Sequence, residues 1–203
     1  MPRSDYVNAK SYKKNVFKRG ITSTTVRKAV LGLAEPKYKD FYDSVTCDNA
    51  GLIRPLSDIP VGTSDSQRIG DRLRARRITL KMNIYVGVTA ATVRIIVFRW
   101  KPRHGVQPPL PGNVLTAGFL GGVYSPLAPG DNDGSVSRTV LFDRSYSMGS
   151  GSDTTHKIVK TIKCKDSLVQ YHSSSLTDCN DGLYMLVISD AALVNAPTLT
   201  YIA

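Results

Sequence analysis

The chain has 203 residues and carries 27 Lys and Arg against 16 Asp and Glu, a formal charge of +11. Hydrophobic residues make up 41% and charged residues 21%, an ordinary globular composition that predicts one folded domain and excludes wholesale disorder. The most apolar stretch, 78–98, is interrupted by Lys81, Asn83 and Arg94 and is rich in β-branched residues. This predicts paired strands rather than a membrane helix, and no membrane partner is expected.

The first 39 residues are strongly basic. They hold ten Lys and Arg against two acidic residues, a net charge of +8, whereas the remaining 164 residues net only +3. A basic segment ahead of a nearly balanced body is typical of an arm that binds a polyanion, because each Lys or Arg near a phosphate releases a condensed counterion. A merely solubilising tail is the alternative. The predicted nucleic-acid-binding residues are Arg3, Lys10, Lys13, Lys14, Lys18, Arg19, Arg27 and Lys28.

A short amphipathic helix is predicted at about 24–35 in this arm. Ser23 to Thr25 offer an N-cap, and Pro36 stops the helix. The apolar residues between them recur at helical spacing, i, i+3, i+4 and i+7: Val26, Ala29, Val30 and Leu33. We therefore divide the chain into an N-terminal arm, 1–36, and a body, 37–203.

The body has the pattern of an all-β domain. From Tyr38 onward the hydrophobic period changes to two, and short apolar runs are separated by Gly, Pro, Asn and Asp clusters. Eight or nine strands in one body indicate a sandwich or a barrel. The predicted strands are Lys39–Cys47, Gly51–Leu56 (strand or extended loop), Arg72–Val88, Ala91–Trp100, Ser137–Met148, His156–Cys164, Leu168–Ser173, Leu183–Ser189 and Thr198–Ile202.

Two of these runs predict finer detail. In 72–88 the apolar residues change phase at Arg76 and Arg77, which predicts a β-bulge that keeps both apolar sets facing one core. The nearly continuous apolar runs 93–98 and 183–188 predict central strands covered on both faces. The segment 107–134 is long and rich in Pro and Gly, and it contains a helical candidate at Asn113–Leu120. We expect it to form contacts in an assembly rather than to be a passive insertion.

The sequence offers no recognisable catalytic or cofactor motif. It contains no Gly-x-Ser-x-Gly elbow and no phosphate-binding Gly-x-x-x-x-Gly-Lys loop. Cys47, Cys164 and Cys179 are wrongly spaced for a zinc site, and their odd number leaves at least one free thiol, which favours a reducing compartment. Asp131 to Gly134 is interpreted as a turn rather than a calcium loop. We expect a non-enzyme without a small-molecule substrate.

Several segments carry a resemblance to a known family. The stretch 59–74, which contains Gln67-Arg68-Ile69-Gly70-Asp71, precedes a long basic strand and then Val93 to Arg99. Further similar segments follow in order at 113–115, 140–144 and 182–190. Together they resemble the coat proteins of very small icosahedral viruses, of the satellite tobacco necrosis virus type and of Rep-encoding single-stranded DNA viruses with circular genomes.

The resemblance implies an eight-stranded antiparallel jelly-roll sandwich whose copies assemble into a T=1 shell of about sixty subunits. Its partners would be itself and single-stranded DNA or RNA, packaged by the inward-pointing arm through sequence-independent phosphate contacts. The expected location is the virion, with the host nucleus or cytoplasm during assembly. The alternative is a cellular nucleic-acid-binding β-barrel. A ligand-binding jelly roll of lectin type is a third option, but it leaves the basic arm unexplained.

The family's intersubunit calcium site is matched only in part. Glu35 falls where an acidic ligand would lie, but Ile69 and Arg72 stand near positions of other oxygen ligands, and the chain ends Tyr201-Ile202-Ala203 without an acidic terminus. We expect no cofactor, with calcium at subunit interfaces left as the alternative. Arg72, Arg74, Arg76 and Arg77 are assigned either to interface ion pairs, with aspartates such as Asp65 and Asp71, or to an inner surface that contacts the genome.

Overall fold

The computed structural model describes residues 36–86, 89–102, 108–116, 122–128, 136–150, 154–172 and 179–203. The chain divides into two compact units, Met1–Lys37 and Tyr38–Ala203, and the description below concerns the second. The predicted arm helix at about 24–35, the eight predicted arm cations and the turn at 131–134 lie outside the described residues.

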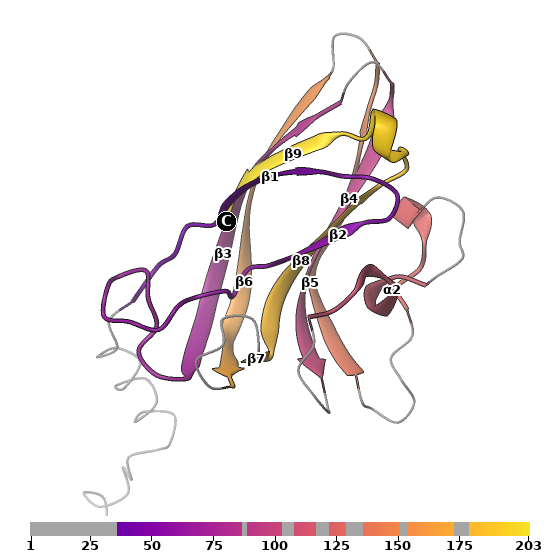
Figure 1. Ribbon diagram of the computed structural model, residues 1–203. Coiled ribbons are helices and arrows are strands. Elements are labelled where there is room, and N and C mark those ends of the chain that lie inside the picture. The colour runs from indigo at the N-terminus through magenta and orange to yellow at the C-terminus, as the bar shows by residue number, and fades with distance from the viewer. Residues whose placement is uncertain are drawn as a thin grey trace, which may run out of the picture. The chain divides into compact units, whose positions relative to one another are not determined.

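The second unit is built from two antiparallel β-sheets, which confirms the all-β prediction (Figure 1). The first sheet, sheet A, has the order β1-β9-β3-β6-β7, and the second, sheet B, has the order β2-β8-β4-β5. The strands are β1 Tyr42–Thr46, β2 Leu52–Pro55, β3 Arg72–Tyr85, β4 Ala91–Pro102, β5 Val136–Met148, β6 Thr155–Tyr171, β7 Cys179–Asn180, β8 Gly182–Ser189 and β9 Thr198–Ile202. Three one-turn elements lie in the described parts of the connections: α2 Pro111–Val114, η2 Gly122–Tyr124 and η3 Leu193–Asn195.

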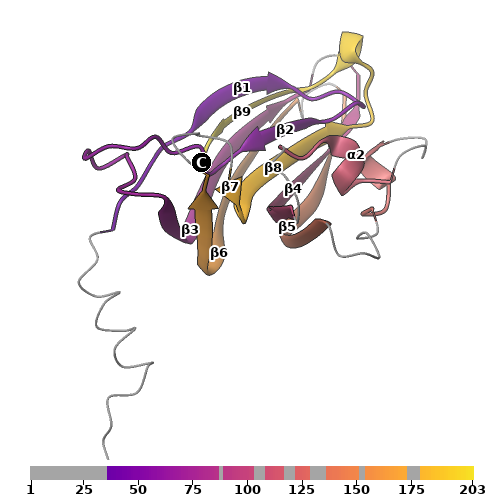
Figure 2. The same cartoon turned by 60° about the horizontal axis from the view of Figure 1, so that its bottom comes forward.

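The main core lies between the two sheets. Along β3, Ile78, Leu80, Met82 and Ile84 alternate with exposed or half-buried neighbours, as expected of a strand with one face inside. They pack with alternate residues of β4 and β8, such as Val93. Figure 2 shows the two sheets from a direction in which both layers can be followed.

The predicted bulge in β3 is confirmed. The register between β3 and β6 shifts between Ala75 and Arg77. In β6 the irregularity includes Lys165, whose φ of 53° lies in the left-handed region. Because both strands change phase at this point, Leu73 and Ala75 before the bulge and Ile78 and Leu80 after it all face the interior, while Arg76 and Arg77 are both exposed.

Two predicted strands prove to be one. Residues 155–171 form the single strand β6, where we predicted His156–Cys164 and Leu168–Ser173. The change of phase around Lys165 imitates a strand break in the sequence, but the chain stays paired with β3 on both sides of the bulge. The two-residue strand β7 was not predicted.

β4 and β8 are central strands of sheet B and are covered on both faces, as predicted. All eight residues of β8 are buried. On the face away from the main core, Ile96, Phe98 and Leu186 pack against Val114 and Leu115. The helical candidate 113–120 is wrong in its bounds: α2 begins at Pro111 and ends at Val114, because Leu115 turns extended and forms an isolated bridge with Leu127.

Candidate nucleic-acid interface

The outer face of sheet A collects positive charge. On β3 the outward positions beyond the bulge are Arg77, Thr79, Lys81, Asn83 and Tyr85, all exposed except the half-buried Thr79. Antiparallel pairing sets each beside a residue of β6 on the same face. The pairs are Arg77 with Lys163, Thr79 with Thr161, Lys81 with Val159, Asn83 with Lys157 and Tyr85 with Thr155.

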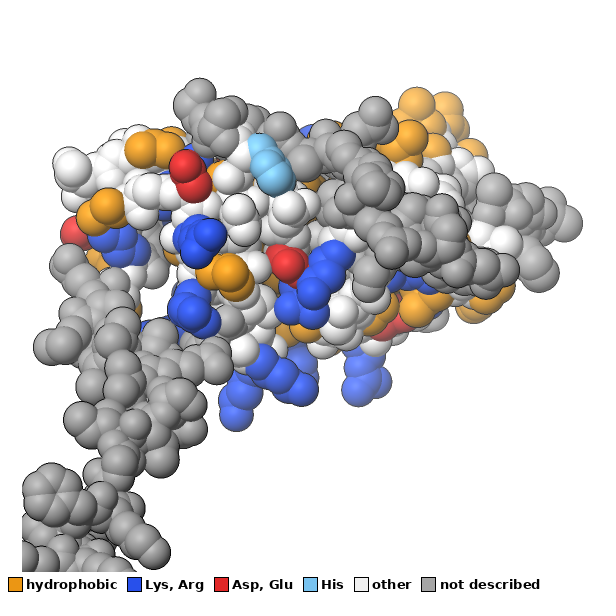
Figure 3. All heavy atoms as spheres, turned by 90° about the horizontal axis from the view of Figure 1, so that it is seen from below, with side chains coloured by type: hydrophobic (Ala, Val, Ile, Leu, Met, Phe, Trp, Pro, Cys, Tyr) orange, Lys and Arg blue, Asp and Glu red, His pale blue; other side chains and the backbone are white. Residues whose placement is uncertain are grey.

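We call this surface the cationic face. Its members are the exposed Lys and Arg residues on the outward side of β3 and β6: Arg72, Arg74, Arg76, Arg77, Lys81, Lys157, Lys163 and Lys165. The described side chains of these two strands include no Asp or Glu, and the side chain of Asp166 in β6 lies outside them. Figure 3, which views the molecule from below, shows Lys and Arg side chains gathered along its lower margin.

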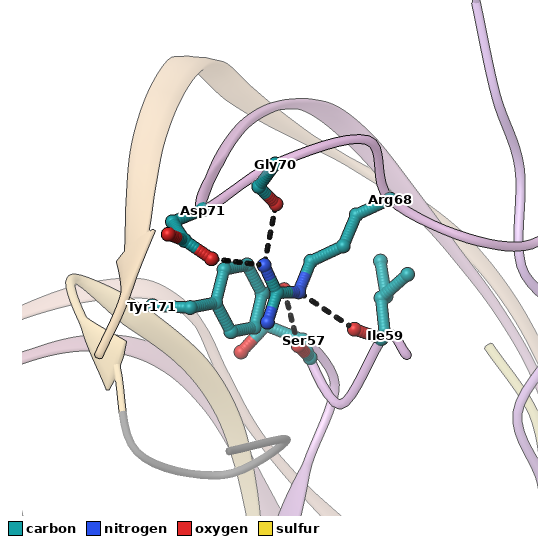
Figure 4. A network of polar contacts seen from close by, with 6 residues as sticks. All are labelled: Ser57, Ile59, Arg68, Gly70, Asp71 and Tyr171. Atoms are coloured by element: carbon teal, nitrogen blue, oxygen red, sulfur yellow. Dashed lines mark hydrogen bonds and ion pairs between the residues drawn. The ribbon is translucent and has the colours of Figure 1, made fainter. Parts of the chain in front are cut away.

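A buried arginine fixes the approach of the chain to this face. Arg68 is 2% exposed, and its Nε donates a hydrogen bond to the carbonyl oxygen of Ile59 at 3.1 Å. Its Nη1 donates to the carbonyl of Gly70 and forms an ion pair with Asp71 Oδ1 at 3.0 Å (Figure 4). The loop between β2 and β3 is thereby closed on itself immediately before Arg72 begins β3.

The same guanidinium joins the loop to the far end of β6. Its carbon atom lies 3.9 Å from the centroid of the Tyr171 ring, and the Tyr171 hydroxyl donates to the carbonyl of Ser57 at 2.6 Å (Figure 4). Burial is the main cause that raises the pKa of Tyr171. Arg68 and Tyr171 therefore hold the start of β3 and the end of β6 in one rigid arrangement.

Cations outside the cationic face have acidic partners in several places. On sheet B, Arg94 forms a two-pronged pair with Asp143, at 2.9 and 2.8 Å, and this hydrogen bonding raises the pKa of Arg94. Its remaining nitrogen, Nη1, donates to two carbonyls of the segment 122–128. Arg99 and Lys101 both lie 3.3 Å from Asp181.

The four arginines predicted from sequence are all exposed on β3. The pairing of Asp71 with Arg68 is within the chain; whether Asp65 or Asp71 also pairs with the four arginines of another copy stays a prediction. Lys81, Lys157, Lys163 and Lys165 were not identified from the sequence, although Lys157, Lys163 and Lys165 share one phase that carries the signal once β6 is known to pair with β3. Arg68 was not identified either, because nothing in the local pattern marks it as buried.

The described part of the chain contains no cluster of three or more His, Cys, Asp or Glu side chains that could hold a metal ion. Glu35, the candidate calcium ligand, lies outside it. The three cysteines form no disulfide and are buried, and burial raises the pKa of the Cys47 thiol to about 12 and that of Cys164 to about 11. These two thiols are therefore poor nucleophiles. Among the described helices, none is long and apolar enough to cross a membrane.

No family model matches the chain, and no curated protein matches its sequence.

Proposed function

We propose that the chain is a jelly-roll coat subunit that self-assembles into a closed T=1 shell of about sixty copies and packages single-stranded nucleic acid through its basic arm. The observation that carries the proposal is the nesting of the strand pairs. With the two-residue β7 set aside, β1 pairs with β9, β2 with β8, β3 with β6 and β4 with β5, all antiparallel. First-with-last pairing of eight strands is what rolling one long hairpin into two sheets produces, and jelly rolls of this kind form viral capsid domains.

The distribution of charge supports the same function. The arm carries a net charge of +8, and about sixty arms would offset on the order of several hundred phosphates. The cationic face concentrates eight exposed Lys and Arg residues on the outer face of sheet A. A closed shell has an inside and an outside, so a subunit with charge on one side suits a container for a polyanion.

Sedimentation velocity of the purified full-length protein, recorded at one nucleic-acid and one protein wavelength, tests the proposal. We expect a sharp boundary near sixty subunits of 22.2 kDa, about 1.3 MDa. Excess nucleic-acid absorbance in that boundary would report packaged cargo. A monomer or small oligomer that stays small after nucleic acid is added would overturn the shell.

The cationic face also favours a second candidate, a cellular nucleic-acid-binding β-barrel protein. Such a protein would use the same exposed lysines and arginines without assembling. The sedimentation experiment separates the two, because the second candidate predicts a small complex of defined stoichiometry with an added oligonucleotide.

A further inference from the structure

A like-charged pair stands at the centre of the cationic face. Arg77 and Lys163 are direct cross-strand partners, and both are exposed. Like charges directly opposite one another destabilise a sheet. The repulsion between the two cations therefore destabilises the sheet locally, and an anion bound between them would relieve that repulsion.

The bulge adds further cations around this pair. It exposes Arg76 and Arg77 in succession, which regular alternation would not allow, and the exposed Lys165 lies in the stretch of β6 between Lys163 and Ser167 that the bulge leaves out of the register. Lys165 has a φ of 53°, a conformation that residues other than Gly rarely adopt and that is concentrated at functional sites. Both strands thus depart from regular geometry where the cations are densest.

The surroundings of the pair suit a single strand of nucleic acid. Lys81 lies four residues beyond Arg77 and Tyr85 four beyond that, all on the outward side of β3 at intervals of about 13 Å. Tyr85 is 57% exposed. A row of cations that ends in an exposed aromatic ring can follow a phosphate backbone and stack an unpaired base. Hydroxyl groups such as that of Thr161 can donate to further phosphate oxygens.

We propose that Arg77, Lys163 and Lys165, which we call the bulge cluster, bind the phosphates of single-stranded nucleic acid as a contact separate from the arm, with Lys81 and Tyr85 continuing the track. The inference rests on the proposed function only in its choice of ligand, and it adds a second binding site on the body. The site reads no base sequence, because its contacts are to phosphates and to a ring face.

The first test is a chemical footprint on the unaltered full-length chain. Lysines are acetylated with and without a thirty-nucleotide oligo-dT, and modification is quantified by mass spectrometry. Lys160 provides an internal control, because it is exposed on the same strand but has the opposite phase to Lys163. We expect a severalfold drop in modification at Lys163, Lys165 and Lys81 and none at Lys160. Equal change at Lys163 and Lys160 would overturn the proposal.

The second test compares two full-length double variants with the same loss of charge. R77S/K163S removes the central pair, whereas R144S/K160S removes one Arg and one Lys that are exposed on β5 and β6 off the cationic face. Oligo-dT binding is measured by fluorescence anisotropy at several salt concentrations, with protein dilute enough to scatter no light. The slope of log K against log salt is negative, and the loss of two phosphate contacts should make it shallower by about 1.4. We expect this change in the first variant only.

The outcomes separate this site from the proposed function. Equal slopes in the two variants would reject nucleic-acid binding by the bulge cluster. The shell proposal would then be decided by the sedimentation experiment alone. A slope difference in a protein that never forms particles would support the cluster and reject the shell. Equal affinity of the unaltered protein for oligo-dT and for phosphatidylserine vesicles, with both lost to the same extent in R77S/K163S, would also count against a nucleic-acid site. Circular dichroism confirms that each variant is folded.

Discussion

The guanidinium carbon of Arg68 lies 3.9 Å from the centroid of the Tyr171 ring, although Arg68 lies in the loop before β3 and Tyr171 is the last residue of β6. The contact is almost fully buried on the arginine side. It stabilises the loop that leads into β3 and thereby the starting point of the cationic face.

Replacing Arg68 with Met should lower the free energy of unfolding by about 2–4 kcal/mol, because the carbonyls of Ile59 and Gly70 lose their donor and the ring loses its cation. Urea unfolding measures the change. Arg72→Met is the matched control: it removes the same group from an exposed position, and a change within about 0.5 kcal/mol is expected. Equal destabilisation of the two variants would contradict the role given to Arg68.

Alkaline pH should destabilise the body before it titrates the folded thiols and phenols. Burial raises the pKa of Cys47 from 9.0 to about 12, and burial with nearby Asp43 raises that of Tyr201 from 10.0 to about 12. Both groups ionise first in the unfolded chain, so their contribution is complete below pH 9.0 and is lost as the pH rises towards 12. Once a group ionises in the unfolded chain, it should lower the free energy of unfolding by about 1.4 kcal/mol for each further pH unit.

The measurement is the urea midpoint at a series of pH values from 8 to 11. Cys47→Ala should weaken the dependence between pH 9 and 10, where that thiol titrates only in the unfolded chain. Stability that stays flat over this range in the unaltered protein would show that Cys47 does not remain protonated on folding.

Arg94→Met should release the segment 122–128 from sheet B. The side chain of Arg94 donates to the carbonyls of Val123 and Ser125 and also pairs with Asp143. We expect the free energy of unfolding to fall by roughly 2–3 kcal/mol and proteolysis within the segment to become faster. Asp143→Asn provides the comparison, since it weakens the ion pair but keeps both carbonyl contacts. If proteolysis is as fast in Asp143→Asn, the carbonyl contacts do not hold the segment.

Deleting residues 1–22 should remove most packaged nucleic acid while the body stays folded. The deletion takes away six of the ten basic residues of the arm region, and phosphate neutralisation governs how much polyanion is retained. The ratio of nucleic-acid to protein absorbance in purified particles reports the cargo, and circular dichroism reports the fold. Particles with unchanged nucleic-acid content would reject the arm as the main packaging element.

The sequence predicted those parts of the fold that depend on alternation. The phase change at Arg76 and Arg77 located the bulge, and the continuous apolar runs identified β4 and β8 as central strands. The same rule failed in β6, because a lysine at φ 53° shifts the phase without ending the strand. Alternation describes the faces of a strand, and it cannot distinguish a bulge from a break.

The candidate site was only partly accessible to such reasoning. Four arginines of β3 are contiguous enough in sequence to be noticed, whereas Lys157, Lys163 and Lys165 join them only through the register of β6. Arg68 is the clearest omission. Arg68 is buried because the carbonyls of Ile59 and Gly70 and the ring of the distant Tyr171 converge on it, and that convergence is a property of the tertiary structure.

The nested pairing also constrains how the domain can fold. The hydroxyls of Ser44 and Thr200 lie 3.3 Å apart across β1 and β9, yet 156 positions separate them in the chain. Contacts between residues so distant in sequence form late, because the entropy of closing the intervening loop opposes them until the inner pairs are in place. During synthesis β1 therefore stays unpaired until β9 has emerged from the ribosome. Such a chain completes its fold only after translation has passed the last strand.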